Sequence, residues 1–408
     1  MLTILIIFIN IFVIECKIIK FLHLSDIHLD LEYSQNSPNN CYLIDSRLGC
    51  CHKYDFAKKP YKNCSEWGDF KCDIPLLFIN NTLKWIKENI PDLEFIIYTG
   101  DSTNHNDIRQ SIKFNIQTIN MVYELFKFWF GNIKVYNTIG NHDTYPVDQS
   151  SNIINKYFFK NYAKQWIGYD WITNNSYNDI IYGCYYITYI QNLDIYILNI
   201  NSLLYEQNNI FNVTQLGLDQ IEWINRQLEH IQNDNSRVII ISHLDPYTSE
   251  ANKLYREQML VIIDTFNEII ISSLYGHTHK DEIILFKNND NMSTNFGFIP
   301  GSITLQNHES SFRIYDYDID TFKIVDYTHY ISNLSKIIKH DNIIFKKSYS
   351  LKQEYNMTHI NVNEVELLYE NILKSRDICN IYCSHYNSLG NYSEFKCIKS
   401  MNKIICKS

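Results

Sequence analysis

The chain of 408 residues lacks several features that would assign it to common classes of protein. It has no block of lysine and arginine, and its formal net charge is -9, so a nucleic-acid polymer is not expected as its main partner. Only 7 prolines are present and no internal repeat is visible, which argues against long disordered linkers. Beyond residues 2–14 there is no long apolar run, so no transmembrane segment is expected after a leader has been cleaved.

Cysteines are present, but none of the 11 forms a Cys-x-x-Cys pair, which argues against a cysteine zinc site. The apolar run at 2–14 has the length of a signal-peptide core and is too short to span a bilayer, although no lysine or arginine precedes it. Cleavage near Cys16 would leave an even number of cysteines, as a disulfide framework prefers. We therefore predict a signal peptide over 1–16 and a secreted or lumenal protein, with reduced thiols as the alternative.

Polar motifs follow five segments that are typical of buried strands, at 17–24, 94–99, 133–139, 237–241 and 269–275. Open α/β sheets bind ligands beyond the carboxyl ends of their strands, so these motifs would meet at one rim. The motifs are Asp26-Ile27-His28, Gly100-Asp101, Gly140-Asn141-His142-Asp143, Ser242-His243 and Gly276-His277-Thr278-His279. Each motif alone is weak, because an isolated histidine at a strand end is more often structural. Their shared context predicts a joint site.

The donor types suit two divalent cations that share one carboxylate. Asp101 is the candidate bridge. Asp26, His28 and His279 would complete one metal, and Asn141, His243 and His277 the other. Such metals activate a water for attack on phosphorus and hold a phosphoryl oxygen in line, so hydrolysis of a phosphate ester is predicted.

The chain resembles the calcineurin-like metallophosphoesterase superfamily and, more narrowly, the acid sphingomyelinase-like phosphodiesterases. The resemblance covers 17 to about 330 and implies zinc as the metal. It also implies an α/β (α+β) four-layer sandwich, in which two mixed β-sheets are flanked by helices. The narrower resemblance rests on Asp101-Ser102-Thr103-Asn104-His105, Trp67-Gly68-Asp69-Phe70-Lys71-Cys72-Asp73-Ile74-Pro75, Gly49-Cys50-Cys51 and Gly276-His277-Thr278-His279-Lys280-Asp281-Glu282.

The resemblance also implies roles for two histidines outside the metal ligands. His142 would stabilise charge that develops on the phosphate or protonate the leaving oxygen, and His105 is the second candidate acid. Both roles need a protonated imidazole, which favours an acidic working pH. Asp143 could orient His142 or could only form the turn, and both readings stay open.

The remaining pattern suggests the domain organisation. Amphipathic helices are expected at 75–90, 108–129 and 215–231, and strands at 282–286, 296–299, 312–317 and 322–327, which fit a second sheet packing on the first. We expect a catalytic domain over 17–330. Residues 331–408, with a helix at 364–373 and four cysteines, are expected to form a small disulfide-stapled helical subdomain.

The family pattern implies the disulfides Cys41–Cys50, Cys51–Cys72, Cys379–Cys383 and Cys397–Cys406. Cys64 and Cys184 are left over, either paired with each other or free. The family has a further bridge between two loops that correspond here to 201–205 and 244–247, where this chain has no cysteine. Because these loops border the substrate side of the site, the difference bears on specificity.

These observations lead to a secreted phosphodiesterase for small phosphodiester or pyrophosphate substrates, such as nucleotides and CDP-choline. The absence of room for a saposin domain before Asp26 favours this reading over the alternative, which is release of the phosphocholine head group from sphingomyelin. A third hypothesis is a catalytically silent binding protein, but all seven ligand positions and His142 are present. A glycoprotein is expected from eight sequons that an asparagine-rich chain also generates by chance, at Asn63, Asn80, Asn174, Asn212, Asn291, Asn333, Asn356 and Asn391.

Overall fold

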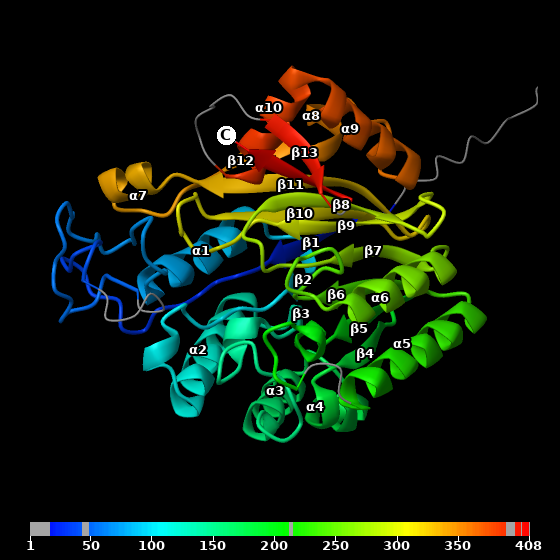
Figure 1. The fold of residues 1–408 in the computed structure, drawn as a ribbon, viewed down its shortest axis with the longest axis horizontal. Helices are drawn as coiled ribbons and strands as arrows, with labels where there is room; N and C mark the ends of the chain where they lie inside the picture. Colours follow the sequence, from blue (N-terminus) through cyan, green and yellow to red (C-terminus); the bar gives the residue numbers. More distant parts are fainter. Residues whose placement is uncertain (1–16, 43–48, 212–214, 389–395, 401, 408) are drawn as a thin grey trace, which may run out of the picture.

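The computed structural model describes residues 17–42, 49–211, 215–388, 396–400 and 402–407. The expected signal peptide, with Cys16, lies outside the described residues. Two six-stranded sheets form the centre of the molecule, and Figure 1 shows them stacked between helices. The predicted sandwich of two mixed sheets flanked by helices is confirmed.

The first sheet has the strand order β12-β11-β10-β1-β2-β3. β1, β2 and β3 are parallel, and β10 pairs antiparallel with β1. Its strands are β1 (Ile18–Leu24), β2 (Leu93–Tyr98), β3 (Lys134–Asn137), β10 (Ser311–Asp318), β11 (Lys323–Ser332) and β12 (Phe345–Ser350).

The second sheet has the order β4-β5-β6-β7-β9-β8, with β5, β6, β7 and β9 parallel. Its strands are β4 (Tyr186–Ile190), β5 (Ile195–Ile200), β6 (Arg237–Ser242), β7 (Ile270–Leu274), β8 (Asp281–Lys287) and β9 (Ser293–Pro300). The expectation that the four later strands belong to a second sheet is therefore wrong in part. β8 and β9 extend the second sheet, but β10 pairs with β1 in the first sheet and β11 pairs with β10. The local pattern does not predict this, because β1 lies at the other end of the chain.

Helices cover both outer faces of the paired sheets (Figure 1). α1 and α2 pack on the first sheet, where Trp85 contacts Phe312 and Phe126 contacts Tyr98. A separate apolar cluster joins the second sheet to α5 and α6. The helices are α1 (Leu76–Asn89), α2 (Ile112–Phe130), α3 (Lys156–Gly168), α4 (Tyr177–Gly183), α5 (Gln215–Asn233), α6 (Lys253–Thr265), α7 (Leu334–His340), α8 (Leu351–Glu354), α9 (Val362–Lys374) and α10 (Arg376–Tyr386).

α2 begins four residues later than the pattern predicts. The Ser111 side chain accepts a hydrogen bond from the Phe114 N–H and caps the helix, and a cap of this kind fixes the start of a helix. Residues 107–109 form a separate 3-10 turn instead, which lies beside the functional site.

The C-terminal segment packs on the edge of the second sheet. α9 and α10 lie against β8 and β9 together with a hairpin of β13 (Lys396–Ser400) and β14 (Lys403–Lys407), and Figure 1 shows this group at one end of the molecule. β11 runs across the expected boundary at 330, and β12 joins the first sheet, so the segment contributes strands as well as helices. The division into 17–330 and 331–408 stays a prediction.

The disulfide expectations have mixed outcomes. Cys41–Cys50 and Cys51–Cys72 are formed, and the Cys64 sulfur lies against the same Cys51 rather than near Cys184, which is buried and free. The prediction of the disulfides Cys379–Cys383 and Cys397–Cys406 is wrong. The structure has Cys379–Cys397 and Cys383–Cys406, because α10 presents two cysteines one turn apart to the facing hairpin.

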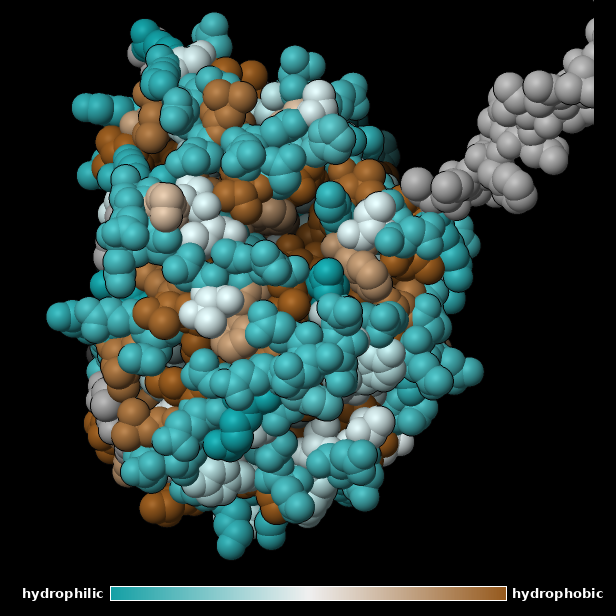
Figure 2. All heavy atoms as spheres, turned by 90° about the vertical axis from the view of Figure 1, so that its right-hand side faces the viewer, coloured by the Kyte–Doolittle hydropathy of each residue, from teal (hydrophilic) through white to brown (hydrophobic). Residues whose placement is uncertain are grey.

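The surface is largely polar where Figure 2 shows it. On that face hydrophilic residues cover most of the area and hydrophobic residues gather in separate groups. In the described ranges, no helix has both the length and the apolarity that crossing a bilayer requires.

Candidate metal centre

The loops after five parallel strands converge where the two sheets meet. β1, β2 and β3 end at one edge of the first sheet, and β6 and β7 at the adjoining edge of the second. Hydrogen bonds tie these ends together: Asp26 N–H donates to the Gly100 carbonyl within the first sheet, and Gly276 N–H to the His243 carbonyl within the second. Between the two sheets, His277 N–H donates to the Asp26 carboxylate at 3.1 Å. All seven predicted ligands therefore reach one place, although they come from two sheets rather than one.

The backbone of these loops is strained. Five of the seven predicted ligands have positive φ: Asp26 (52°), His28 (45°), Asp101 (61°), His277 (75°) and His279 (57°). Each such residue costs roughly 1–3 kcal/mol and persists only where its surroundings hold it, commonly at functional sites. A Cβ on Gly140 would collide with the Asp101 carboxylate, so glycine is required there.

The first group of donor atoms comes from Asp26, His28, Asp101 and His279. The Nε2 atoms of His28 and His279 are 3.0 Å apart. His28 Nε2 lies 3.4 Å from Asp101 Oδ2, and His279 Nε2 lies 3.5 Å from Asp26 Oδ1. Ligands that are 2.0–2.2 Å from one ion are roughly 3 to 4 Å from each other, so these spacings fit a single cation.

The second group comes from Asp101, Asn141, His243 and His277. His243 Nε2 lies 3.1 Å from Asn141 Oδ1 and 3.3 Å from Asp101 Oδ2. His277 Nδ1 lies 3.2 Å from Asn141 Oδ1. The same Asp101 oxygen therefore faces a histidine of each group, which is the arrangement that a bridging carboxylate needs.

Hydrogen bonds fix which ring nitrogens face the two groups. His28 Nδ1 lies 2.8 Å from the Thr103 carbonyl oxygen and His243 Nδ1 lies 2.7 Å from that of Thr99. A carbonyl oxygen only accepts, so each Nδ1 carries the hydrogen and each Nε2 presents its lone pair. Burial and neighbouring histidines keep the pKa of His28 well below its usual value, and the neutral imidazole is the form that binds metals.

The pKa of His243 is shifted in the opposite direction to that of His28. Burial lowers its pKa, but the carboxylates of Asp101 and Asp26 raise it to about 10. A proton therefore competes with a cation for His243 Nε2, and binding of a metal must release this proton.

Asp143 serves the backbone rather than His142. Its buried carboxylate accepts hydrogen bonds from the N–H groups of Asp101 (2.8 Å), Ser102 (2.7 Å) and Gly140 (3.0 Å). It holds the Gly-Asp loop and the Gly-Asn loop against each other. Of the two readings left open by the sequence, the turn-forming one agrees with these contacts.

His142 lies next to the bridging carboxylate. Its N–H donates to Asp101 Oδ1 at 2.9 Å, and its Nδ1 lies 3.3 Å from the Asp107 carboxylate. Although burial lowers the pKa of His142, Asp107 and Asp101 raise it to about 9. The side chain is therefore suited to carry a positive charge beside the metal centre.

His105 is held by a carboxylate that the sequence reasoning missed. Asp73 accepts hydrogen bonds at 2.8 Å from both the N–H and the ring Nδ1 of His105. The His105 ring stacks on His28 with centroids 3.7 Å apart and lies 4.5 Å from the His142 ring. Asp73 belongs to the stretch Trp67–Pro75, on which the family resemblance partly rests. The sequence therefore pointed to this stretch, but it did not predict that Asp73 would bind His105.

Two further carboxylates that the sequence reasoning missed support the second group of donors. Asn141 Nδ2 donates to Asp148 at 2.9 Å, which turns the amide oxygen toward the histidines. The Glu250 carboxylate contacts His277 Nε2, so His277 faces the group with Nδ1. Contacts of this kind fix the orientation of metal ligands. Neither residue belongs to a recognisable motif.

Hydrogen bonds join the two loops for which the family pattern implies a disulfide. Leu244 N–H donates to the Ser202 hydroxyl at 2.9 Å, and Gln207 N–H donates to the Glu250 carbonyl at 2.8 Å. The loop that carries Glu250 is thereby fixed without a cysteine.

Comparison with known proteins agrees with this geometry. The family model for calcineurin-like phosphoesterases matches residues 19–281. The chain belongs to this family. The match spans all five motifs that supply the seven predicted ligands, and it confirms the resemblance inferred from the motifs.

Several curated relatives of this phosphoesterase cover most of the chain. Sphingomyelin phosphodiesterase B of Dictyostelium discoideum is 26% identical over 95% of the chain and 63% of its own length, and sphingomyelin phosphodiesterase A of the same organism is 27% identical over 82% and 57%. The human cyclic GMP-AMP phosphodiesterase SMPDL3A is 25% identical over 83% of the chain and 76% of its own length. The chain thus spans about three fifths of the two Dictyostelium proteins.

The solved structures that match the chain are more distant in sequence. A dimetal phosphatase from Danio rerio is 10% identical, with a TM-score of 0.47 over 81% of this chain and 99% of its own.

The donor set of this phosphoesterase suits two divalent cations. It offers imidazole nitrogens, one neutral amide oxygen and few carboxylates, as zinc, manganese or iron prefer. The strained loops, the shared Asp101 oxygen and the hydrogen bonds behind the ligands all fit a site built for metals.

Proposed function

We propose that the protein is a metal-dependent phosphodiesterase that hydrolyses small phosphodiester or pyrophosphate substrates. The observation that carries this proposal is the position of Asp101 Oδ2, 3.4 Å from His28 Nε2 and 3.3 Å from His243 Nε2. An oxygen shared by two groups of donors is typical of hydrolases that use a pair of ions. Asp26, His28 and His279 would hold one cation, and Asn141, His243 and His277 the other, with zinc as the expected metal.

When bound, the two cations supply Lewis acidity and an activated water near neutral pH. The side chains of the protein do the rest. His142 carries its charge beside Asp101 and would stabilise the phosphoryl oxygens in the transition state. His105, oriented by Asp73, would donate a proton to the departing alkoxide.

The substrate class has two candidates. One relative is named a cyclic GMP-AMP phosphodiesterase, which supports soluble nucleotide-type substrates. Others are named sphingomyelin phosphodiesterases, which supports release of the phosphocholine head group from sphingomyelin as the second candidate. Four disulfides among the described cysteines suit an oxidising compartment, so we propose a secreted or lumenal location.

The test compares hydrolysis of nucleoside triphosphates, CDP-choline and sphingomyelin in detergent by the zinc-loaded protein at acidic and neutral pH. His142→Ala is the matched variant. Turnover of nucleotides and CDP-choline that His142→Ala abolishes supports the first candidate, and turnover of sphingomyelin alone supports the second. No turnover of any substrate, with metals bound, would favour the silent binding protein instead.

A further inference from the structure

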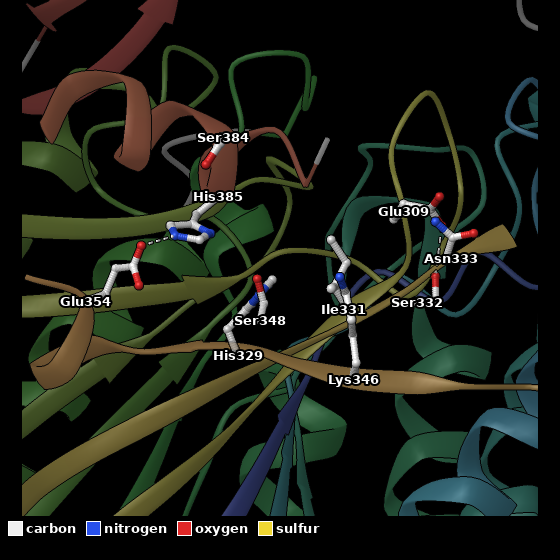
Figure 3. Close-up of a pocket in the computed structure, with 10 residues that line it drawn as sticks. All are labelled: Glu309, His329, Ile331, Ser332, Asn333, Lys346, Ser348, Glu354, Ser384 and His385. Carbon is white, nitrogen blue, oxygen red and sulfur yellow. Dashed lines mark hydrogen bonds and ion pairs between the residues drawn. The ribbon is translucent and has the colours of Figure 1, made fainter. Parts of the chain in front are cut away.

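Two polar cavities adjoin the end of α10. The first lies between β11 and β12 and is balanced by groups of the protein, since Glu354 lies 3.0 Å from His385 Nε2 and His329 lies 3.6 Å from the Asp281 carboxylate. Figure 3 shows Glu354 and His385 side by side. The second cavity has a volume of about 300 Å³ and differs from the first in its position and in its lining.

The second cavity borders the metal centre. Thr278, which lines it, lies between the predicted ligands His277 and His279. Ser249 also lines it and precedes Glu250, whose carboxylate contacts His277. A substrate whose phosphate is held by the metal centre can therefore extend into this cavity.

The charged groups around this cavity balance one another. Lys403 Nζ lies 3.0 Å from Asp245 and 2.7 Å from Glu282. Lys280 forms no ion pair with a described residue, and its ammonium lies 5.8 Å from the centre of the Tyr386 ring. Two ammonium groups are therefore matched by two carboxylates, so the cavity as a whole does not select an ion of either sign.

Hydroxyl groups form another part of the lining. Thr248 and Ser249 belong to the loop after β6, and Ser400 belongs to β13 of the C-terminal hairpin. None of these three hydroxyls forms a hydrogen bond with a described residue. Because each hydroxyl can both donate and accept, the set suits an uncharged group that carries several hydroxyls of its own.

A choline group suits this cavity poorly. Quaternary ammonium groups bind to aromatic faces, but the Lys280 ammonium already lies over Tyr386, and the Tyr247 ring packs against Phe286 with centroids 5.8 Å apart. The Glu282 carboxylate is engaged in its ion pair. A second cation would therefore meet the like charge of Lys280 without a free carboxylate to bind it.

We propose that this cavity binds a sugar-type group of the substrate, such as the ribose of a nucleotide, and that Lys280 determines the preference for this group over choline. The ammonium and the three hydroxyls would form hydrogen bonds with the sugar hydroxyls. Specificity is a difference between two affinities, and the same ammonium favours the sugar and repels choline. The inference rests on the proposed function and selects nucleotide-type substrates from its two candidates.

The test compares two phosphodiesters that share a p-nitrophenyl leaving group, the p-nitrophenyl ester of uridine 5′-monophosphate and p-nitrophenyl phosphocholine. For the metal-loaded protein, kcat/KM should be higher for the uridine ester. Lys280→Met keeps the length of the side chain but removes its charge, so it should lower the ratio of the two kcat/KM values at least about tenfold, and Ser400→Ala should lower it about threefold. Lys399→Met is the control, because this exposed residue of the same hairpin does not line the cavity.

Binding of the two products separates this inference from the phosphodiesterase activity. Titration of the metal-loaded protein with uridine 5′-monophosphate and with phosphocholine needs no turnover, and Lys280→Met should weaken binding of the first at least about tenfold without weakening the second. This pattern in a protein without turnover would support the cavity and overturn the proposed activity. An unchanged ratio or unchanged binding in Lys280→Met, or a wild-type protein that prefers the choline compounds or binds neither product, would overturn the inference.

Discussion

Asp73→Asn is expected to impair proton donation by His105 without removing a metal ligand. The carboxylate of Asp73 accepts two hydrogen bonds of 2.8 Å from His105 and is 8% exposed. An amide would offer an N–H, in place of an acceptor oxygen, to one of the two donors of His105, so the ring would lose its fixed orientation. General acid catalysis contributes about 10²–10⁴-fold, and a positioning contact of this kind about 10–100-fold, so kcat should fall about 100-fold.

The assay uses two phosphodiesters that differ in leaving group. An alkyl alcohol needs a proton as it leaves, whereas p-nitrophenolate does not, so the loss should be about 100-fold on the alkyl ester and less than about 3-fold on the nitrophenyl ester. Asp69→Asn is the control, because this carboxylate from the same loop contacts Asn39 and not His105. In a His105→Ala background, Asp73→Asn should have no further effect.

Equal losses on both esters would refute this reasoning, because they would indicate a damaged metal centre rather than a lost proton donor. An effect of Asp73→Asn that persists in His105→Ala would equally show that Asp73 acts through another residue.

Three further predictions concern metal affinity and stability. Glu250→Gln should lower the affinity for one of the two metals about 10–100-fold, because the substitution releases His277. Metal titration should show an unchanged affinity for the other metal. Asp281→Asn should lower the free energy of unfolding by about 3–5 kcal/mol in urea denaturation, because it leaves the buried Arg313 unpaired, whereas a loss under 1 kcal/mol would contradict a buried pair. Burial lowers the pKa of His329 from 6.5 to about 4. Between pH 4 and pH 6.5, the unfolded chain therefore binds a proton on this histidine that the folded protein does not bind. Stability from this group is full above pH 6.5 and about 3 kcal/mol lower at pH 4, and His329→Gln should flatten that slope relative to the wild type.

The strands, and the meeting of the polar side chains that follow them, could be predicted from the sequence because both signals are local. A continuous apolar run such as 238–241 predicts a buried strand, and a histidine two residues after it must lie at the strand end. Asp101 could be chosen as the bridge because a carboxylate is the donor that two cations share.

The pairing of the sheets could not be predicted in the same way. β10 reads as an apolar strand, but its partner is β1, and no local pattern encodes a partner so far away along the chain. The positioning carboxylates have the same difficulty. Asp148 and Glu250 lie in loops without regular pattern, and only folding brings them to Asn141 and His277.

The C-terminal disulfides show how a family pattern can mislead. Cys379 and Cys383 lie one helical turn apart, so both point toward the hairpin on the same side of α10. Pairing within the helix would leave the hairpin unattached. The crossed pairing that the structure has joins α10 to both β13 and β14.

The most direct test of the two-metal centre is anomalous diffraction from crystals of the purified protein, recorded above and below the absorption edge of the bound metal. We expect two anomalous peaks per chain, with one oxygen of Asp101 in contact with both, His28 on one side and His243 on the other. A single peak, or two peaks of which Asp101 contacts only one, would contradict the account.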